Sequence, residues 1–224
     1  MFKIIMNEPQ RGYEFLRFLV ELGEKYPQLA AFYPIGADIF VFVYPIFLTA
    51  VYLYGMIKKK IEAKKEALFI FFACLFSVVV NILSQQFFDK QRPIYAFGIQ
   101  DLDQETLLHQ FLPSTSFPSD HAVVTFSVAM ATWLIAHKHH NKRLKIWSGF
   151  LFFFAIITGL CRIGTTVHRT TDILAGTIMG ILVPIVLMLP FCFKRVEKRL
   201  LNPIIHFEEW LIKKAFQCKK THKQ

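Results

Sequence analysis

Cysteine is scarce in this sequence and shows no pairing pattern. Only four cysteines occur in 224 residues, and none forms a Cys-x-x-Cys arrangement, so neither a disulfide framework nor a zinc site is indicated. The first ten residues, MFKIIMNEPQ, lack a long apolar core, and we predict no cleavable signal peptide. Internal repeats and low-complexity linkers are missing as well, which leaves the composition of the chain as the next guide.

Charged residues are also few, and acidic ones are the rarest. Asp and Glu number 16 against 26 Lys and Arg, for a net charge of +10. In a soluble protein this excess would indicate nucleic-acid binding. Here the basic residues fall mainly between apolar runs, as the positive-inside rule describes for membrane proteins, so we expect no nucleic-acid partner.

Apolar residues, by contrast, are abundant. They make up 54% of the chain, with 25 Phe, and the mean hydropathy is +0.40. A bilayer-spanning helix needs about 20 mostly apolar residues, and five stretches approach that length. We therefore predict an all-α integral membrane protein, a bundle of about five transmembrane helices. The predicted spans are residues 37–57, 67–88, 119–137, 146–163 and 172–193.

The segments on either side of the spans have a different pattern. Residues 10–26 and 202–217 mix apolar with charged positions and predict amphipathic helices, which either lie on the membrane surface or pack on the domain itself. The predicted organisation is an N-terminal amphipathic segment at the external face, a membrane domain and a basic cytoplasmic tail. These parts cover residues 1–35, 36–193 and 194–224.

The connectors between spans predict the orientation. Residues 58–66 carry five lysines, and residues 137–145 and 194–199 carry four Lys or Arg each. With five spans, all three lie on one side, which the positive-inside rule makes cytoplasmic. Residues 89–118 and 164–171 then lie outside. We expect a multi-pass protein of the inner (plasma) membrane with a cytoplasmic C-terminus.

Several polar residues collect at the external ends of the predicted spans. Ionisable groups at this depth are costly and are candidates for function. They come from four different helices and reach one level of the membrane. They are Arg92, Ser119, Asp120, His121, Arg162, His168 and Asp172.

His168 and Asp172 are separated by one helical turn, so they can share a face. An aspartate beside a histidine holds one tautomer and leaves the other ring nitrogen as an oriented nucleophile or base. Arg92, before Pro93, and Arg162 reach the same level. Two guanidiniums directed at one point suit a phosphate, whose oxygens accept forked hydrogen bonds.

The stretch SFPSDHAVVTF begins a predicted span with Pro118. Ser119 and Asp120 occupy its first turn, where free backbone N–H groups and the helix dipole favour an anion. The Ser119 hydroxyl can add a donor, and His121 is placed to donate a proton to a leaving oxygen. These residues together predict a phosphate site with an acid beside it.

Three ordered motifs carry a resemblance to a known family. QQFFDKQRP (85–93), PSDH (118–121) and CRIGTTVHRTTD (161–172) resemble the Lys-x6-Arg-Pro, Pro-Ser-Gly-His and Ser-Arg-x5-His-x3-Asp signature of the type-2 phosphatidic acid phosphatase superfamily. That superfamily includes glucose-6-phosphatase and vanadium haloperoxidases. The resemblance covers about the central two thirds of the chain.

The resemblance implies a role for each matched residue. His168 attacks phosphorus and forms a phosphohistidine, Asp172 orients His168, and His121 protonates the leaving group. The phosphoryl oxygens are bound by Arg92, Ser119 and Arg162. No cofactor is implied, and no metal, since the cluster lacks the carboxylates that Mg²⁺ would want.

The sequence departs from the signature at three positions. Gln85 stands in place of the lysine, Asp120 in place of the glycine and Cys161 in place of the serine. Gln85 keeps a neutral donor, and Lys90 is near but out of register. The Asp120 variant resembles the branch that dephosphorylates undecaprenyl pyrophosphate, so Gln85 and Asp120 are counted among the candidate phosphate-binding residues.

The function predicted from this sequence is hydrolysis of undecaprenyl pyrophosphate, with the lipid itself as partner. The nearest alternative is a phosphatase of phosphatidylglycerophosphate, phosphatidic acid or a lipid A phosphate. A phosphate transporter or channel would need polar residues through its spans, and these spans are mostly apolar. A metal sensor built on HKHH (137–140) would lie in a basic connector far from the cluster. The sequence carries no signal for an oligomeric state.

Overall fold

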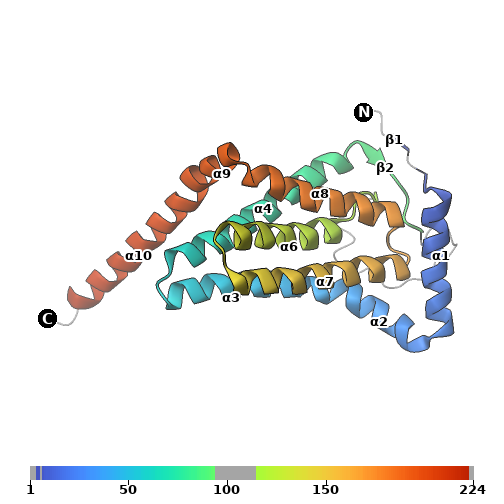
Figure 1. Cartoon of the computed structure of the whole chain (residues 1–224), viewed down its shortest axis with the longest axis horizontal. Coiled ribbons are helices and arrows are strands. Elements are labelled where there is room, and N and C mark those ends of the chain that lie inside the picture. The colour runs from blue at the N-terminus through green and yellow to red at the C-terminus, as the bar shows by residue number, and fades with distance from the viewer. Residues whose placement is uncertain (1–3, 6, 94–114, 222–224) are drawn as a thin grey trace.

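The protein is a bundle of helices that run back and forth between two ends (Figure 1). The structure, a computed structural model, describes residues 4–5, 7–93 and 115–221. The elements in chain order are β1 (Ile4–Ile5), α1 (Gln10–Lys25), α2 (Pro27–Asp38), the 3₁₀ turn η1 (Phe40–Phe42), α3 (Val43–Ile57), α4 (Ile61–Gln85), β2 (Phe88–Asp89), α6 (Asp120–Lys138), α7 (Lys142–Gly164), α8 (Thr170–Met188), α9 (Pro190–Val196), the π-helical turn η3 (Glu197–Leu201) and α10 (Asn202–Thr221). The all-α membrane fold predicted from the sequence is confirmed.

Within the described residues, four helical segments are long and apolar enough to cross a membrane. They correspond to four of the five predicted spans, with altered ends. The first begins earlier than predicted, because α2 and η1 lead directly into α3. The segments are Pro27–Ile57, Ile61–Gln85, Lys142–Gly164 and Thr170–Met188.

The remaining predicted span, residues 119–137, is α6, which has 19 residues but does not belong to that apolar set. It lies in the middle of the bundle and packs against α4, α7 and α8 (Figure 1). A helix enclosed by others does not need a lipid-facing apolar surface. The buried hydroxyls of Thr125 and Thr132 donate to carbonyls one turn earlier, at 2.7 Å each, so these two hydroxyls are satisfied within the helix.

The two flanking amphipathic segments are helical, as predicted. Helix α1 packs across one end of the bundle against α2, α7 and α8, with Leu16 and Leu19 buried (Figure 1). Helix α10 leaves the bundle at the opposite end and is tied to α4 by the Lys64–Glu208 ion pair of 3.0 Å. Of the two alternatives left open for α1, packing on the domain itself is what the structure shows.

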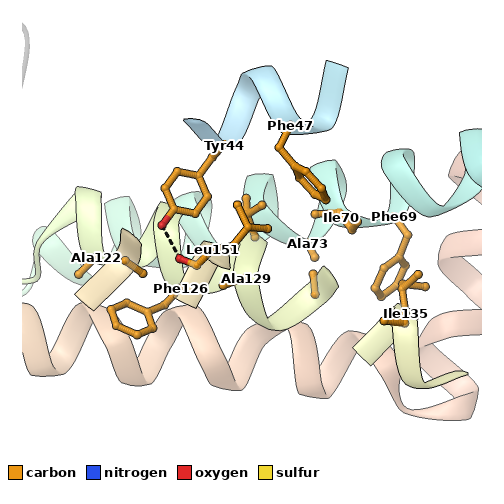
Figure 2. Packing of buried hydrophobic residues seen from close by; sticks show 14 of the residues in the cluster. Tyr44, Phe47, Phe69, Ile70, Ala73, Ala122, Phe126, Ala129, Ile135 and Leu151 are labelled. Carbon is orange, nitrogen blue, oxygen red and sulfur yellow. Dashed lines mark hydrogen bonds between the residues drawn. The ribbon is translucent and has the colours of Figure 1, made fainter. Parts of the chain in front are cut away.

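Aromatic and aliphatic side chains fill the space between α3, α4, α6 and α7 (Figure 2). The Tyr44 hydroxyl donates to the Leu151 carbonyl at 2.8 Å and so ties α3 to α7. Ile70, Ala73 and Ala129 are fully buried. Small residues such as these alanines let neighbouring helices approach closely, which is typical of membrane bundles.

Helices α6 and α8 approach most closely at two glycines one turn apart. A Cβ added at Gly176 would lie 2.7 Å from the Ser119 carbonyl oxygen, and one added at Gly180 would lie 2.8 Å from that of Val123. This contact joins the first turns of the two helices, where the Ser119 N–H donates to the Asp172 carbonyl at 3.1 Å. Two of the predicted motifs are therefore adjacent in space.

Candidate active site

The end of the bundle covered by α1 holds the predicted site residues. The end of α4, the start of α6 and the turn between α7 and α8 meet there (Figure 1). Most of the predicted side chains are inaccessible to solvent although they are polar or charged. Those classed as buried are Gln85, Arg92, Ser119, Arg162, His168 and Asp172, while Asp120 and His121 are partly exposed.

The imidazole of His168 is held from both sides. Its Nδ1 lies 3.0 Å from the Ser116 carbonyl oxygen, and its Nε2 lies 3.3 Å from Nη2 of Arg162. Because a carbonyl can only accept, Nδ1 carries the proton in this contact. The lone pair of Nε2 is then directed toward the guanidinium. A nitrogen that attacks a phosphate held by this guanidinium requires a lone pair on that side.

His168 lies in the turn between α7 and α8 and is 3% exposed. The pKa of its imidazole is lowered to about 4, mainly by burial; Asp172 raises this pKa in part, and the Arg162 and Arg92 guanidiniums contribute to lowering it. Burial disfavours the charged form of a histidine. The ring is consequently neutral at pH 7, with its Nε2 lone pair on the side of the Arg162 guanidinium.

Asp172 contacts three groups from one buried position. Its Oδ2 is 3.6 Å from His168 Nδ1 and accepts the Arg169 N–H at 2.8 Å, while its Oδ1 is 2.8 Å from Nζ of Lys90. The predicted His168–Asp172 pairing is present, but Ser116 is the closer acceptor for the ring. The contact predicted for Asp172 is therefore made more closely by a backbone carbonyl that the motifs do not reveal, and the orienting role of Asp172 stays a prediction.

Both predicted arginines reach the same place. Arg162 donates to Oδ1 of Asp38 at 3.0 Å, at the end of α2, and Arg92 donates to the Val167 carbonyl at 3.3 Å, next to His168. Within the described part of the chain, Arg162 Nε and the Ser119 hydroxyl are buried without a hydrogen-bond partner. Buried donors of this kind are costly, and an anion at the site would satisfy them.

Gln85 and Asp120 contact each other rather than pointing freely into the site. The Gln85 amide donates to Asp120 Oδ1 at 2.9 Å and to the Pro118 carbonyl at 3.1 Å. The Asn81 amide donates to the same carboxylate oxygen at 2.6 Å. This geometry fixes the start of α6 on α4, and the phosphate contacts predicted for Gln85 and Asp120 stay predictions.

His121 is the second residue of α6, and its carbonyl accepts the Thr125 hydroxyl at 2.7 Å. Its position in the first turn places it beside Ser119. The Ser119 N–H, predicted as part of an anion site, is engaged by the Asp172 carbonyl. That amide therefore joins two helices and is not available to a phosphate, which leaves its buried hydroxyl as the donor Ser119 can offer.

Two residues of this site, Lys90 and Glu8, were not predicted as site residues from the sequence. Lys90 Nζ lies 2.8 Å from Oε2 of Glu8 as well as 2.8 Å from Asp172, and the three side chains are at most 2% exposed. The hydroxyl of Thr171 contacts both Lys90 and Glu8. Gly12 leaves room for this arrangement, since a Cβ there would lie 2.1 Å from Glu8 Oε1.

The sequence carries only a weak signal for the contact of Lys90 with Glu8 and Asp172. Lys90 is two positions from Arg92 and out of register with the family lysine, and Glu8 comes from a segment before the first helix. Only the folded chain brings the N-terminal segment against α8. In the structure, β1 pairs with β2 through Ile4 and Phe88, and this pairing positions Glu8 near Lys90.

A family comparison agrees with this geometry. Residues 66–195 match the PAP2 superfamily, which is more than half of the chain and includes every predicted site residue. The chain belongs to the PAP2 superfamily. This is the type-2 phosphatidic acid phosphatase family that the three motifs resemble, so that prediction is confirmed. The protein is accordingly a membrane phosphatase of the PAP2 class, a phosphoric ester hydrolase.

Individual relatives are more distant. The chain is 24% identical over 177 residues to the bacitracin transport permease protein BcrC of Bacillus licheniformis, covering 79% of both chains. It is similar to the crystal structure of Aquifex aeolicus LpxE, with 23% identity, a TM-score of 0.54 and coverage of 82% of this chain and 98% of the other. A phosphatidylglycerolphosphate phosphatase from Bacillus subtilis matches at 20% identity and a TM-score of 0.41, over 87% and 100% of the chains.

Proposed function

We propose that this protein hydrolyses undecaprenyl pyrophosphate to undecaprenyl phosphate and inorganic phosphate at the external face of the plasma membrane. The observation that supports the chemistry is the state of His168. It is buried, its Nδ1 proton faces the Ser116 carbonyl, and its Nε2 faces the Arg162 guanidinium. A neutral, oriented imidazole beside a guanidinium suits nucleophilic attack on a phosphoryl group.

In this proposal, His168 Nε2 attacks the terminal phosphorus and forms a phosphohistidine. Arg162, Arg92 and the Ser119 hydroxyl hold the equatorial oxygens, where negative charge builds in the transition state. The proton on Nδ1 stays with the ring, which becomes cationic as the N–P bond forms. Ser116 and Asp172 stabilise that cation, since a carbonyl and a carboxylate lie 3.0 and 3.6 Å from Nδ1.

His121 completes the proposed reaction by protonating the oxygen of the leaving lipid phosphate. It then accepts a proton from the water that hydrolyses the phosphohistidine, so it returns to its starting state. No step of this scheme requires a metal ion, because the two arginines supply the positive charge that a metal would provide.

The lipid substrate is the finer part of the proposal. The FPSDH sequence resembles the undecaprenyl pyrophosphate branch, and the Asp120 carboxylate of this sequence accepts from the Asn81 and Gln85 amides. A phosphatase of phosphatidylglycerophosphate, phosphatidic acid or a lipid A phosphate is the second candidate, since the family as a whole acts on several lipid phosphates.

Phosphate release from a panel of lipids tests the proposal. Purified protein in one detergent is supplied with undecaprenyl pyrophosphate, phosphatidic acid and phosphatidylglycerophosphate, each with EDTA and no added metal. We expect phosphate release to be fastest from undecaprenyl pyrophosphate. The activity should be lost in His168→Ala and kept in His206→Ala, which changes an exposed histidine of α10. Faster turnover of a glycerolipid would transfer the function to the second candidate, and a strict need for Mg²⁺ would contradict the mechanism.

A further inference from the structure

A cavity of about 1090 Å³ opens at the end of the bundle opposite the candidate active site, between α3, α4 and α7. Near the start of α3, Tyr44 bonds to Leu151 of α7, and the Phe47 and Trp147 rings are 5.9 Å apart. Past these contacts α3 packs alongside α4. The cavity lies between α3 and the start of α7. It contains none of the residues of the candidate active site.

Two walls of this cavity are apolar. They consist of side chains from α3 and from the first two turns of α7, and both helices belong to membrane-spanning segments. Ile46, Ala50 and Trp147 are exposed in the structure, so the surface is open to an apolar occupant. The apolar wall is formed by Val43, Ile46, Phe47, Ala50, Val51, Leu144 and Trp147.

The mouth of the cavity is cationic. Lys59 and Lys60 come from the turn between α3 and α4, and Lys142 and Arg143 from the start of α7. In the part of the chain that the structure describes, no ion pair engages Lys59, Lys142 or Arg143, whereas Lys60 donates to the Tyr54 hydroxyl at 3.3 Å.

Two carboxylates also line the cavity, Glu62 and Glu66. Glu66 is buried and lies 2.8 Å from Nδ1 of His139, so its carboxylate already has a partner. Four cationic side chains therefore face at most one free carboxylate. This surplus of positive charge, at the mouth of an apolar groove, complements an amphiphile with an anionic head.

The backbone of the two turns at the mouth is unusual. Lys59 and His140 both adopt the left-handed conformation, each with a φ of 52°, and both line the cavity. Glycine occupies such positions at no steric cost, whereas other residues are uncommon there. The chain keeps a cationic or ionisable side chain at each of these turns although a glycine would be easier to accommodate.

We propose that this cavity binds an anionic phospholipid. Its phosphodiester would lie among Lys59, Lys142 and Arg143, and its acyl chains would lie in the groove between α3 and α7. Basic residues near a membrane surface attract anionic lipids, and the apolar walls add burial of the chains. This second lipid site is in the leaflet opposite the one that holds the candidate active site.

Lipid-dependent thermal stability of the purified, delipidated protein tests this site. The probes are phosphatidylglycerol, phosphatidylcholine and inorganic phosphate. We expect phosphatidylglycerol to raise the melting temperature more than phosphatidylcholine, and the double variant Lys142→Gln/Arg143→Gln to weaken phosphatidylglycerol binding by about tenfold. Lys198→Gln/Arg199→Gln, an exposed basic pair of η3 at the same end of the bundle, is the matched control and should keep wild-type affinity.

A second variant tests the groove itself. Ala50→Trp places a large side chain on the exposed apolar wall and should reduce phosphatidylglycerol binding while the cations remain. Phosphate release from the lipid substrate should stay at the wild-type rate in all three variants, which separates this site from the proposed catalysis. Equal stabilisation by phosphatidylcholine, binding of inorganic phosphate alone, or an equal loss in the control pair would overturn the proposal.

Discussion

His168 depends on groups that come from three separate parts of the chain. Its Nδ1 faces Ser116, its Nε2 faces Arg162, and Asp172 lies within 3.6 Å. The motifs predicted the histidine, the arginine and the aspartate, because their spacing places them at the ends of two helices. The carbonyl of Ser116 could not be predicted, since a backbone acceptor leaves no trace in residue identity.

The two histidines should differ in what their loss does. We expect His168→Ala to abolish turnover and any trapped phosphoenzyme, because it removes the nucleophile. His121→Ala should slow release of an unactivated leaving group by about 10²–10⁴-fold, which is the usual contribution of a general acid, and much less for a leaving group of low pKa. Acid-quench trapping of ³²P-labelled protein and kinetics on both ester types measure this, and phosphate trapped by His168→Ala but not by His121→Ala would reverse the assignment.

The pH dependence should report on His168. Burial lowers the pKa of this imidazole to about 4, and only the neutral ring carries the Nε2 lone pair. Activity should therefore be level from pH 7 down to about pH 5 and fall as the pH drops through about 4. The measurement is kcat/KM against pH on an activated ester, for which His121 is not needed, and an acid limb centred between pH 6 and 7 would contradict it.

Lys90 and Glu8 form a buried pair whose loss should be partly reversible. Lys90→Met leaves the Glu8 and Asp172 carboxylates buried without their cation and should destabilise the protein by about 3–5 kcal/mol. Adding Glu8→Gln removes one of these charges and should restore part of the stability.

The rate should not recover with the stability in that double variant. Without Lys90, the charge of Asp172 is no longer shared with a cation and favours the His168 imidazolium more strongly, so the acid limb of the pH profile should move upward. Thermal unfolding and pH–rate profiles of wild type, single and double variants separate the two effects. Full recovery of both stability and rate would mean that Lys90 only holds the N-terminal segment in place.

At the scale of elements, α6 shows where hydropathy alone is insufficient. Its position in the chain and its first-turn residues were predicted, but the sequence could not show that α6 lies among the other helices of the bundle. Burial of most of the helix surface relaxes the requirement for apolar residues, and the Thr125 and Thr132 hydroxyls bond to the helix itself. The same three-dimensional packing explains why β1 and Glu8 were not predicted, since their partners are more than 80 residues away.

The contact of α6 with α8 can be tested at its glycines. Gly180→Ala places a Cβ 2.8 Å from the Val123 carbonyl oxygen, which forces the helices apart and should cost about 1–3 kcal/mol. Gly149→Ala is the control, because an added Cβ there meets nothing within 4 Å, and it should stabilise α7 by up to about 1 kcal/mol. Thermal unfolding in detergent with parallel activity assays would show this, and equal effects of the two changes would refute close packing as the reason for Gly180.

At the scale of the whole molecule, the two ends of the bundle differ in charge and content. One end carries the buried cluster around His168 and is covered by α1, and the other carries the turns after α3 and α6, which belong to the basic connectors 58–66 and 137–145 (Figure 1). The sequence predicted this separation from the alternation of spans and connectors. Residues 94–114, most of the predicted external connector, lie outside the described residues, so the structure adds nothing on that segment.

The orientation of the bundle in the membrane is the remaining prediction at this scale. The positive-inside rule places the lysine-rich end in the cytoplasm, so the candidate active site should face outward. In a background with all four cysteines replaced, Tyr26→Cys reports on the α1 end and Lys142→Cys on the basic end, since both side chains are exposed. An impermeant maleimide applied to whole cells should label Tyr26→Cys alone, and both variants should react after permeabilisation. Labelling of Lys142→Cys in intact cells, with Tyr26→Cys protected, would place the catalytic end in the cytoplasm and exclude action on a lipid presented at the outer face.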